Sequence, residues 1–387
     1  MKSQKFKEHM VNMLTLRYDP MEPPTIPPLK YKAWFPNLYE TTALSLERKL
    51  MSAIMVLEPF KKIAIGLSSG IDSVLLLCII RHLFPEKKIV AIHYIGINDE
   101  LEDAKEYAKI YGAEFVTINK DTILDTIDWQ VTITKDMTWD GFDYLLYQTA
   151  KRLGCDILVD GTGADELLGG YTFRYNSFDH SAGSIERKAY SYLDCHNRDW
   201  VDDQAHLFGK EVKFDWKMVI EHIQPHFANP LPTIQQIFHA DYNGKLCHLF
   251  TKKQEIFAKL YQLPSYSPYL TDEIIKYGSH LDSHIKIMGV VGKLPLRQIA
   301  ARQDLAVTPK KLGFSHDTVR EWNGEHWEEA HNDITDPNNL MFKDGLISFD
   351  WVKRHTMNQK DRYNVRYVNK FFQLMALEDH LRHLDRE

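Results

Sequence analysis

Two short turns rich in glycine and aspartate contain the residue types from which proteins build phosphate-binding sites. Residues 68–73 (SSGIDS) directly follow the apolar run at 63–67, and residues 161–166 (GTGADE) directly follow the mostly apolar segment 156–160. Glycine lets the backbone approach a ligand closely, and the backbone amides at a helix N-terminus bind phosphate oxygens. Asp72 and Asp165 would repel phosphate unless a divalent cation lay between them. The two turns therefore predict a site for a nucleotide phosphate and its metal.

Either turn alone would be weak evidence, because tight turns often contain glycine for conformational reasons only. A purely structural turn is the alternative for residues 68–73 taken by themselves. The three serine hydroxyls of this turn favour the functional interpretation, since they suit phosphate oxygens at the start of a helix.

Predicted strands and helices alternate between residues 61 and 171. Apolar runs predict strands at residues 62–67, 88–94, 114–118 and 156–159. The segments 73–83, 102–111 and 141–153 between them have the apolar spacing of helices. This alternation is typical of an α/β fold with a mainly parallel sheet and helices on both faces. Each turn would follow a buried strand, at the edge of the sheet where such folds bind nucleotides.

The remaining segments divide the chain into three expected parts. Residues 1–40 are rich in proline and predict an extended arm on the main body, followed by a helix at 41–57. Beyond Tyr171 the strand signals fade, and helical patterns occur at 216–222, 246–260, 272–279, 296–302 and 365–383. We therefore expect an N-terminal arm and helix at 1–60, an α/β core at 61–175, and a mostly helical substrate lobe at 176–387.

The composition argues against several classes of protein. The chain has 47 Lys and Arg residues, 53 Asp and Glu residues and a net charge of −6, which argues against broad electrostatic binding to nucleic acid. The four cysteines form no C-x-x-C pair and the histidines have no ligand spacing, so we expect reduced thiols and no zinc. No signal peptide is visible, and no apolar run approaches the ~20 residues that span a bilayer. We expect a cytoplasmic protein without a membrane partner.

Five ordered motifs resemble those of a known family. Residues 67–73 resemble the pyrophosphatase loop of the N-type ATP pyrophosphatases, S-G-G-x-D-S, with Ser69 in place of the first glycine. Residues 161–171 resemble the block G-E-G-A-D-E-x-x-G-G-Y of the asparagine synthetase superfamily. Residues 93–96, 293–297 and 311–314 fall, in the right order, where that family has S-I-G-F, K-x-x-L-R and K-x-G-F. The resemblance spans about residue 30 to the C-terminus and implies an adenine nucleotide α-hydrolase-like fold.

This resemblance implies roles for the matched residues. Those that would bind ATP are Ser68, Ser69, Gly70, Asp72 and Ser73 at the pyrophosphate part, with Leu67, Ile95 and Gly161 at the adenosine. Asp72 and Asp165 would hold Mg²⁺. Lys311 would stabilise charge on the pyrophosphate and on the collapsing tetrahedral intermediate. Lys293 is either a catalytic lysine or an exposed lysine at a helix end.

The resemblance implies an ATP-dependent carbon–nitrogen ligase that forms AMP. A substrate carboxylate would attack the α-phosphorus to give an acyl-adenylate and pyrophosphate, and an amine or ammonia would then displace AMP to form an amide. The acid could be aspartate, another carboxylic acid, a peptide or a modified nucleotide.

Two positions depart from the family pattern. Glutamine-dependent asparagine synthetases carry, directly after the initiator methionine, the cysteine nucleophile of a glutaminase domain, and this chain has Lys2 there. We therefore expect its nitrogen to come as free ammonia, from a separate glutaminase, or as an amine of the substrate. Thr162 stands where asparagine synthetases have a glutamate base and β-lactam synthetases have a tyrosine. Its hydroxyl cannot take up a proton near neutral pH as a carboxylate does, although it can orient or relay one.

Two other functions are weighed against an intermolecular amide ligase. In the first, acid and amine belong to one molecule, as in β-lactam formation or macrocyclisation; the long segment 172–261 and the altered residues 268–270 (PYL) indicate a rebuilt substrate site. In the second, the chain binds a nucleotide without catalysis. The presence of Asp72, Asp165 and Lys311 argues against this second alternative, because a protein that only binds has no need of them together.

Overall fold

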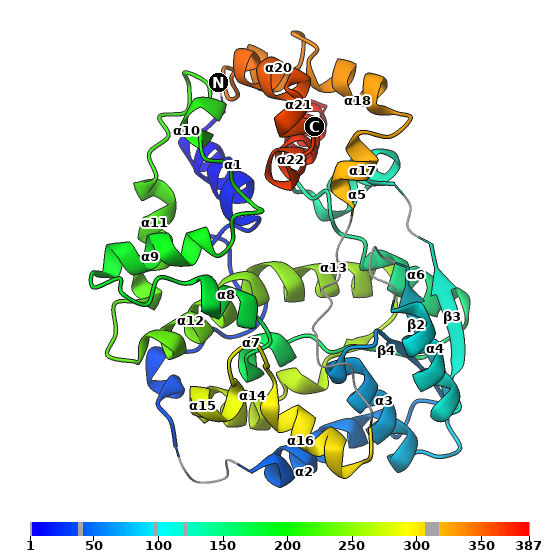
Figure 1. Ribbon diagram of the computed structural model, residues 1–387. Helices are drawn as coiled ribbons and strands as arrows, with labels where there is room; N and C mark the ends of the chain where they lie inside the picture. The colour runs from blue at the N-terminus through cyan, green and yellow to red at the C-terminus, as the bar shows by residue number, and fades with distance from the viewer. Residues whose placement is uncertain (1, 38–41, 96–99, 120–121, 306–316, 387) are drawn as a thin grey trace.

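The sheet predicted from the apolar runs is present in a computed structural model, which describes residues 2–37, 42–95, 100–119, 122–305 and 317–386 (Figure 1). Its strands are all parallel and lie in the order β3-β2-β1-β4-β5. Their bounds are β1 Lys62–Gly66, β2 Lys88–Tyr94, β3 Glu114–Ile118, β4 Ile157–Val159 and β5 Ser265–Tyr266. The first four lie where the sequence predicts them. The fifth, only two residues long, has no signal in the sequence.

The central strands are apolar along most of their length because helices surround the sheet. Ile63 of β1 pairs with Ile89 of β2 on one side and with Ile157 of β4 on the other, and all three are buried. Helices α3 (Ile71–Leu83), α4 (Leu101–Ile110) and α6 (Tyr144–Arg152) contact the strands. Strands buried on both faces show continuous apolar runs rather than alternation, which is the pattern of 62–67 and 88–94. The α/β prediction is confirmed.

The strand order places the two turns side by side. From β1 the chain passes through α3 to β2 on one side of β1, whereas β4 lies on the other side. Since β1 and β4 are parallel neighbours, the turns that follow them leave the sheet at the same edge. A reversal of strand order of this kind opens a crevice at the carboxyl ends of the strands, where α/β proteins bind ligands.

Helices make up most of the remaining chain. In the N-terminal half the others are α1 Gln4–Leu16, α2 Ala43–Ile54, α5 Ile123–Thr134, α7 Ala164–Leu168, α8 Thr172–Ser177 and α9 Ile185–Asp194. They are followed by α10 Gln204–Leu207, α11 Lys217–Ile223, α12 Thr233–Asp241, α13 Thr251–Tyr261, α14 Asp272–His280, α15 Ser283–Lys286 and α16 Leu294–Arg302. The last are α17 Thr318–Trp322, α18 Trp327–Ile334, α19 Leu340–Lys343, α20 Phe349–Met357, α21 Gln359–Arg362 and α22 Val365–Leu384. Among the described residues, no helix combines the length and apolar character needed to cross a bilayer.

The N-terminal segment differs from the extended arm expected over residues 1–40. Gln4–Leu16 forms helix α1, which contacts α11 and α22 and lies close to the C-terminus in Figure 1. Its buried side chains include Val11 and Leu14, and Lys2 forms an ion pair with Asp385 at 3.0 Å. The prediction was wrong here because the prolines begin only at Pro20, after an apolar stretch that has its own helical face. The N-terminus thus packs with the helical part of the molecule.

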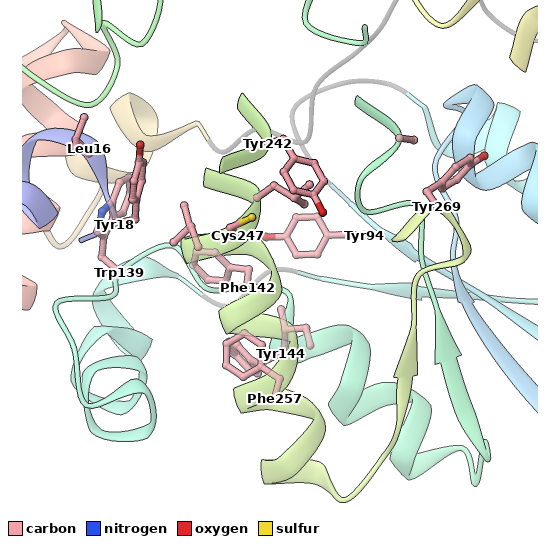
Figure 2. Packing of buried hydrophobic residues seen from close by; sticks show 14 of the residues in the cluster. Leu16, Tyr18, Tyr94, Trp139, Phe142, Tyr144, Tyr242, Cys247, Phe257 and Tyr269 are labelled. Carbon is pink, nitrogen blue, oxygen red and sulfur yellow. The ribbon is translucent and has the colours of Figure 1, made fainter. Parts of the chain in front are cut away.

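A nearly continuous helical stretch connects this part to the sheet. Helix α12, the wide helical segment Tyr242–Phe250 and α13 follow one another without a loop, and Gly244 has a non-helical conformation that kinks the stretch. Figure 2 shows the buried aromatic side chains along it, among them Tyr242 and Phe257. Phe257 packs against Tyr144 of α6, which itself contacts the sheet. This apolar packing joins the helical part to α6, a helix that contacts the sheet.

Candidate active site

The first turn is held by its own hydroxyl groups. The Ser68 backbone N–H donates to Ser73 Oγ at 3.1 Å, and the Gly70 N–H donates to Ser68 Oγ at 3.1 Å. Gly70 is also the N-cap of α3, so residues 71–73 form the first turn of that helix and bring Asp72 into it. The Tyr269 hydroxyl donates to the Asp72 carbonyl oxygen at 3.2 Å. The loop is therefore in a defined conformation at a helix N-terminus, which favours anions.

The second turn approaches the first through its glycines. A Cβ atom on Gly161 would lie 3.1 Å from the Cβ of Asp72, so a larger residue would push the two turns apart. Gly163 has φ of 91°, a backbone conformation that favours glycine, and is the N-cap of α7. Asp165 then lies in the first turn of α7. Both predicted metal aspartates thus occupy the first turns of helices that begin at the same edge of the sheet.

Lys293 joins the two aspartates. Its ammonium contacts Asp72 Oδ2 and lies 2.7 Å from Asp165 Oδ1. Only 5% of Lys293 is exposed, so the interpretation as an exposed lysine at a helix end is wrong. Burial alone would lower the pKa of Lys293, but Asp165 and Asp72 raise it, and the net pKa lies above its usual range. Lys293 is therefore a fixed positive charge between two carboxylates.

The backbone around Lys293 is built to bring this side chain inward. Lys293 has φ of 57°, and its N–H donates to the Leu168 carbonyl at 3.2 Å. A Cβ atom on Gly292 would overlap the carbonyl oxygen of Gly169, so the segment before α16 lies directly on the glycine pair after α7. One helical turn after Lys293, Arg297 contributes a second positive charge near Asp72. The K-x-x-L-R block thereby places two cations beside the aspartates.

Thr162 belongs to a polar network at the end of β4. Its hydroxyl accepts from Gln254 Nε2 at 2.8 Å, and its N–H donates to Asp160 Oδ1 at 2.9 Å. Asp160 also accepts from Gln254 Nε2 at 2.6 Å and from the Ser267 hydroxyl at 2.6 Å. Burial raises the pKa of the Asp160 carboxyl, and these hydrogen bonds act in the opposite direction. A carboxylate thus lies two residues from the position where asparagine synthetases have glutamate.

Glu100 is a further site residue that sequence reasoning missed. Its Oε2 accepts from the Ser69 backbone N–H at 3.3 Å, and burial raises its pKa. Asp160 and Gln254 were missed as well, because neither belongs to a recognised motif and Gln254 reaches the site from helix α13. An acidic residue at the end of a predicted strand was the one available signal for Asp160.

The residues predicted to contact adenosine follow three adjacent strands. Leu67 follows β1 and is buried, Ile95 follows β2 and is 38% exposed, and Gly161 lies after β4. Leu67 donates its N–H to Ile92, and Ile95 donates to Ile118, which continues the pairing at this edge. Lys311, the lysine preferred for pyrophosphate, lies outside the described residues.

The donor set fits a magnesium ion. Asp72 and Asp165 already converge on one positively charged nitrogen, and carboxylate oxygens are the ligands that Mg²⁺ takes together with substrate phosphates. These two residues would hold the ion. Bound there, Mg²⁺ would neutralise phosphate charge and polarise the phosphorus–oxygen bonds.

The family model described as asparagine synthase matches residues 52–381. No curated protein matches the chain. Among solved structures, the chain is similar to the NH3-dependent NAD synthetase from Campylobacter jejuni subsp. jejuni NCTC 11168 in complex with the nitrate ion, at 21% identity and a TM-score of 0.24. That likeness covers 32% of this chain and 58% of the other, so the chain matches little more than half of that protein. Because the family model matches residues 52–381, which is most of this chain, the chain belongs to the asparagine synthase family.

Proposed function

We propose that this protein is an AMP-forming amide ligase that activates a carboxylic acid with ATP. The convergence of Asp72, Asp165 and Lys293 supports this activity most strongly, because it brings two carboxylates, a ligand type that Mg²⁺ prefers, and a buried cation to a helix N-terminus, a feature that favours phosphate. Family membership supports an ATP-dependent ligase in general.

The first step forms an acyl-adenylate. An oxygen of the substrate carboxylate attacks the α-phosphorus of ATP, a new oxygen–phosphorus bond forms, and pyrophosphate leaves with the electrons of the broken bond. The serine loop at residues 68–73 positions the phosphates, and Lys293 and Arg297 offset the negative charge that accumulates on the departing pyrophosphate. Lys311 is proposed to assist at the same group.

The second step forms the amide. The lone pair of an amine or ammonia attacks the acyl carbon, the tetrahedral intermediate collapses, and AMP leaves while the nitrogen loses a proton. The Thr162 N–H donates to Asp160, and both residues flank Gly161, which lies close to Asp72 of the serine loop. We propose that Thr162 orients this proton and that the acid and amine are small molecules or a peptide, with ammonia supplied free or by a separate glutaminase.

Pyrophosphate release tests the proposal directly. Purified protein is incubated with ATP, Mg²⁺ and a panel of carboxylic acids, with and without ammonia or amines, and pyrophosphate and AMP are quantified. Release that depends on one acid supports adenylation, and asparagine formed from aspartate and ammonia would identify the narrow form of the activity. Asp72→Asn and Asp165→Asn should each abolish release. ATP binding without release for any acid would favour a nucleotide-binding protein without catalysis.

A further inference from the structure

Lys293 forms ion pairs with Asp72 and Asp165, the two aspartates that the proposed function assigns to a divalent cation. We propose that Lys293 is an internal counter-ion, so that the site excludes a free divalent cation and accepts one only together with a polyphosphate. This inference rests on the proposed function, because it assumes that the two aspartates serve a metal–nucleotide complex.

The contacts of Lys293 show the competition. Its nitrogen contacts Asp72 Oδ2 and lies 2.7 Å from Asp165 Oδ1, and hydrogen bonds of this kind use the same carboxylate oxygens that a metal would bind. The Lys293 side chain is only 6% exposed, compared with 18% for Asp72 and 22% for Asp165. The two aspartate side chains are therefore more exposed than the lysine side chain, and an incoming cation meets carboxylates whose charge the buried ammonium already offsets in part.

The surroundings keep the ammonium in this place. Gly170 leaves the room that the lysine needs, since a Cβ atom there would come within 2.5 Å of Lys293 Cε. The backbone on either side is fixed by the hydrogen bond to Leu168 and by the close packing of Gly292 on Gly169. The lysine is thus anchored at its Cα, and only its flexible side chain can move away from the aspartates.

Charge balance explains why the cation and the polyphosphate should bind together. A cation that entered alone would displace Lys293 and leave a buried ammonium without its two partners, beside a new positive charge and Arg297. A buried charge that loses its partner carries a large penalty. A polyphosphate removes the penalty, because its oxygens accept hydrogen bonds from the displaced ammonium. Each ligand should therefore raise the affinity for the other, as linkage requires.

Binding of Mn²⁺ to the full chain tests this inference, with calorimetry and the electron paramagnetic resonance of free Mn²⁺ as readouts. For the wild-type protein we expect pyrophosphate to tighten Mn²⁺ binding by a factor of about ten or more. Lys293→Met should bind Mn²⁺ alone about tenfold more tightly than wild type and lose most of the gain from pyrophosphate. Lys253→Met is the matched control, since Lys253 is also buried and paired with an aspartate, Asp140, at 2.9 Å. It should leave both affinities unchanged.

The outcomes separate this inference from the proposed function. If the wild-type protein binds Mn²⁺ equally well with and without pyrophosphate, and Asp165→Asn abolishes that binding, the counter-ion role is wrong while the metal site stands. If Mn²⁺ does not bind even with pyrophosphate or ATP, the proposed function fails and the inference fails with it. Should Lys293→Met not fold, thermal unfolding of the wild-type protein decides: Mg²⁺ with pyrophosphate should raise the Tm, and an equal rise with Mg²⁺ alone would overturn the proposal.

Discussion

Gly170 lies so close to Asp165 that a Cβ atom on the glycine would overlap the Oδ1 atom of the aspartate. The same added atom would come within 2.5 Å of Lys293 Cε. Position 170 therefore requires glycine because the side chains of Asp165 and Lys293 pack directly on it.

Gly170→Ala should disable the site. The added methyl group must displace Asp165 or Lys293, and a misplacement of about 1 Å at a reacting centre can reduce kcat/KM about 100-fold. Pyrophosphate release with the acid identified in the screen provides the measurement. Gly183→Ala is the matched control, because a Cβ atom there meets nothing within 4 Å. Full activity of Gly170→Ala would contradict the packing described for Asp165 and Lys293.

The sequence predicted those parts of the molecule that depend on neighbours along the chain. Apolar runs such as 62–67 and 88–94 identify strands, and their alternation with helices implies a parallel sheet. The sequence alone therefore predicts that Asp72 and Asp165 lie at one edge of that sheet. The position of Lys293 could not be predicted in this way. It depends on the contact of Gly292 with Gly169, two segments more than one hundred residues apart in the chain.

Contacts between segments distant in the chain also explain why other site residues were not predicted. Asp160, Gln254 and Ser267 meet only because the short strand β5 pairs with β4 and α13 passes beside it. Helix α1 has a clear apolar face, but the prolines that follow it dominated the interpretation of residues 1–40. Local patterns therefore identified the two turns, whereas the residues that surround them come from contacts distant in sequence.

His9 should make stability depend on pH. Its imidazole lies 2.8 Å from Asp19 and 3.0 Å from Asp136. Burial acts to lower the pKa of His9, but the hydrogen bonds to Asp136 and Asp19 raise it to about 9. Since the folded-state pKa lies above the ordinary value of 6.5, this stabilisation is fully present below pH 6.5 and is lost as the pH rises to about 9. The effect should be on the order of 2 kcal/mol.

Urea unfolding of wild type and His9→Gln at pH 6, 7.5 and 9.5 measures this contribution. The difference in free energy of unfolding between the two proteins should shrink as the pH rises. His206→Gln, at an exposed histidine, is the control and should change the free energy of unfolding by less than about 0.5 kcal/mol. A constant difference for His9→Gln would show that the imidazole does not bridge the two aspartates as a cation.

Lys286 should destabilise the folded protein. The side chain is fully buried, and within the described part of the chain its ammonium has no hydrogen-bond partner. It lies 4.3 Å from the centre of the Phe238 ring and 5.2 Å from that of Trp34, contacts that offset only part of the lost hydration. Burial lowers the pKa of Lys286 well below 10.5, so the penalty is present at neutral pH and diminishes as the pH rises toward 10.5.

Lys286→Met keeps the length and removes the charge, and it should raise the free energy of unfolding at pH 7 by about 1–3 kcal/mol. The gain should become smaller at pH 10. Exposed Lys276→Met provides the control and should change stability by less than about 0.5 kcal/mol. A clear loss of stability in Lys286→Met would mean that the aromatic rings more than compensate for the buried charge.

Asp160 and Thr162 should affect the second step of the proposed reaction and not the first. Both lie at the end of β4, where the Thr162 N–H donates to Asp160 Oδ1 and Gln254 Nε2 donates both to the Thr162 hydroxyl and to Asp160 Oδ2. A proton that leaves the attacking amine could pass to the Thr162 oxygen while the hydroxyl proton passes to Asp160. General-base assistance of this kind contributes about 10²–10⁴-fold.

With the acid and amine found in the screen, Asp160→Asn and Thr162→Val should slow amide formation about 100-fold or more, while acid-dependent pyrophosphate formation continues. Thr162→Ser keeps the hydroxyl and should remain near the wild-type rate. Because burial raises the pKa of Asp160, amide formation by the wild-type enzyme should decline on the acid side at a higher pH than an exposed carboxyl would give, and Asp160→Asn should lose this dependence. Equal loss of both steps in Asp160→Asn would mean that the carboxylate supports the turn and takes no part in proton transfer.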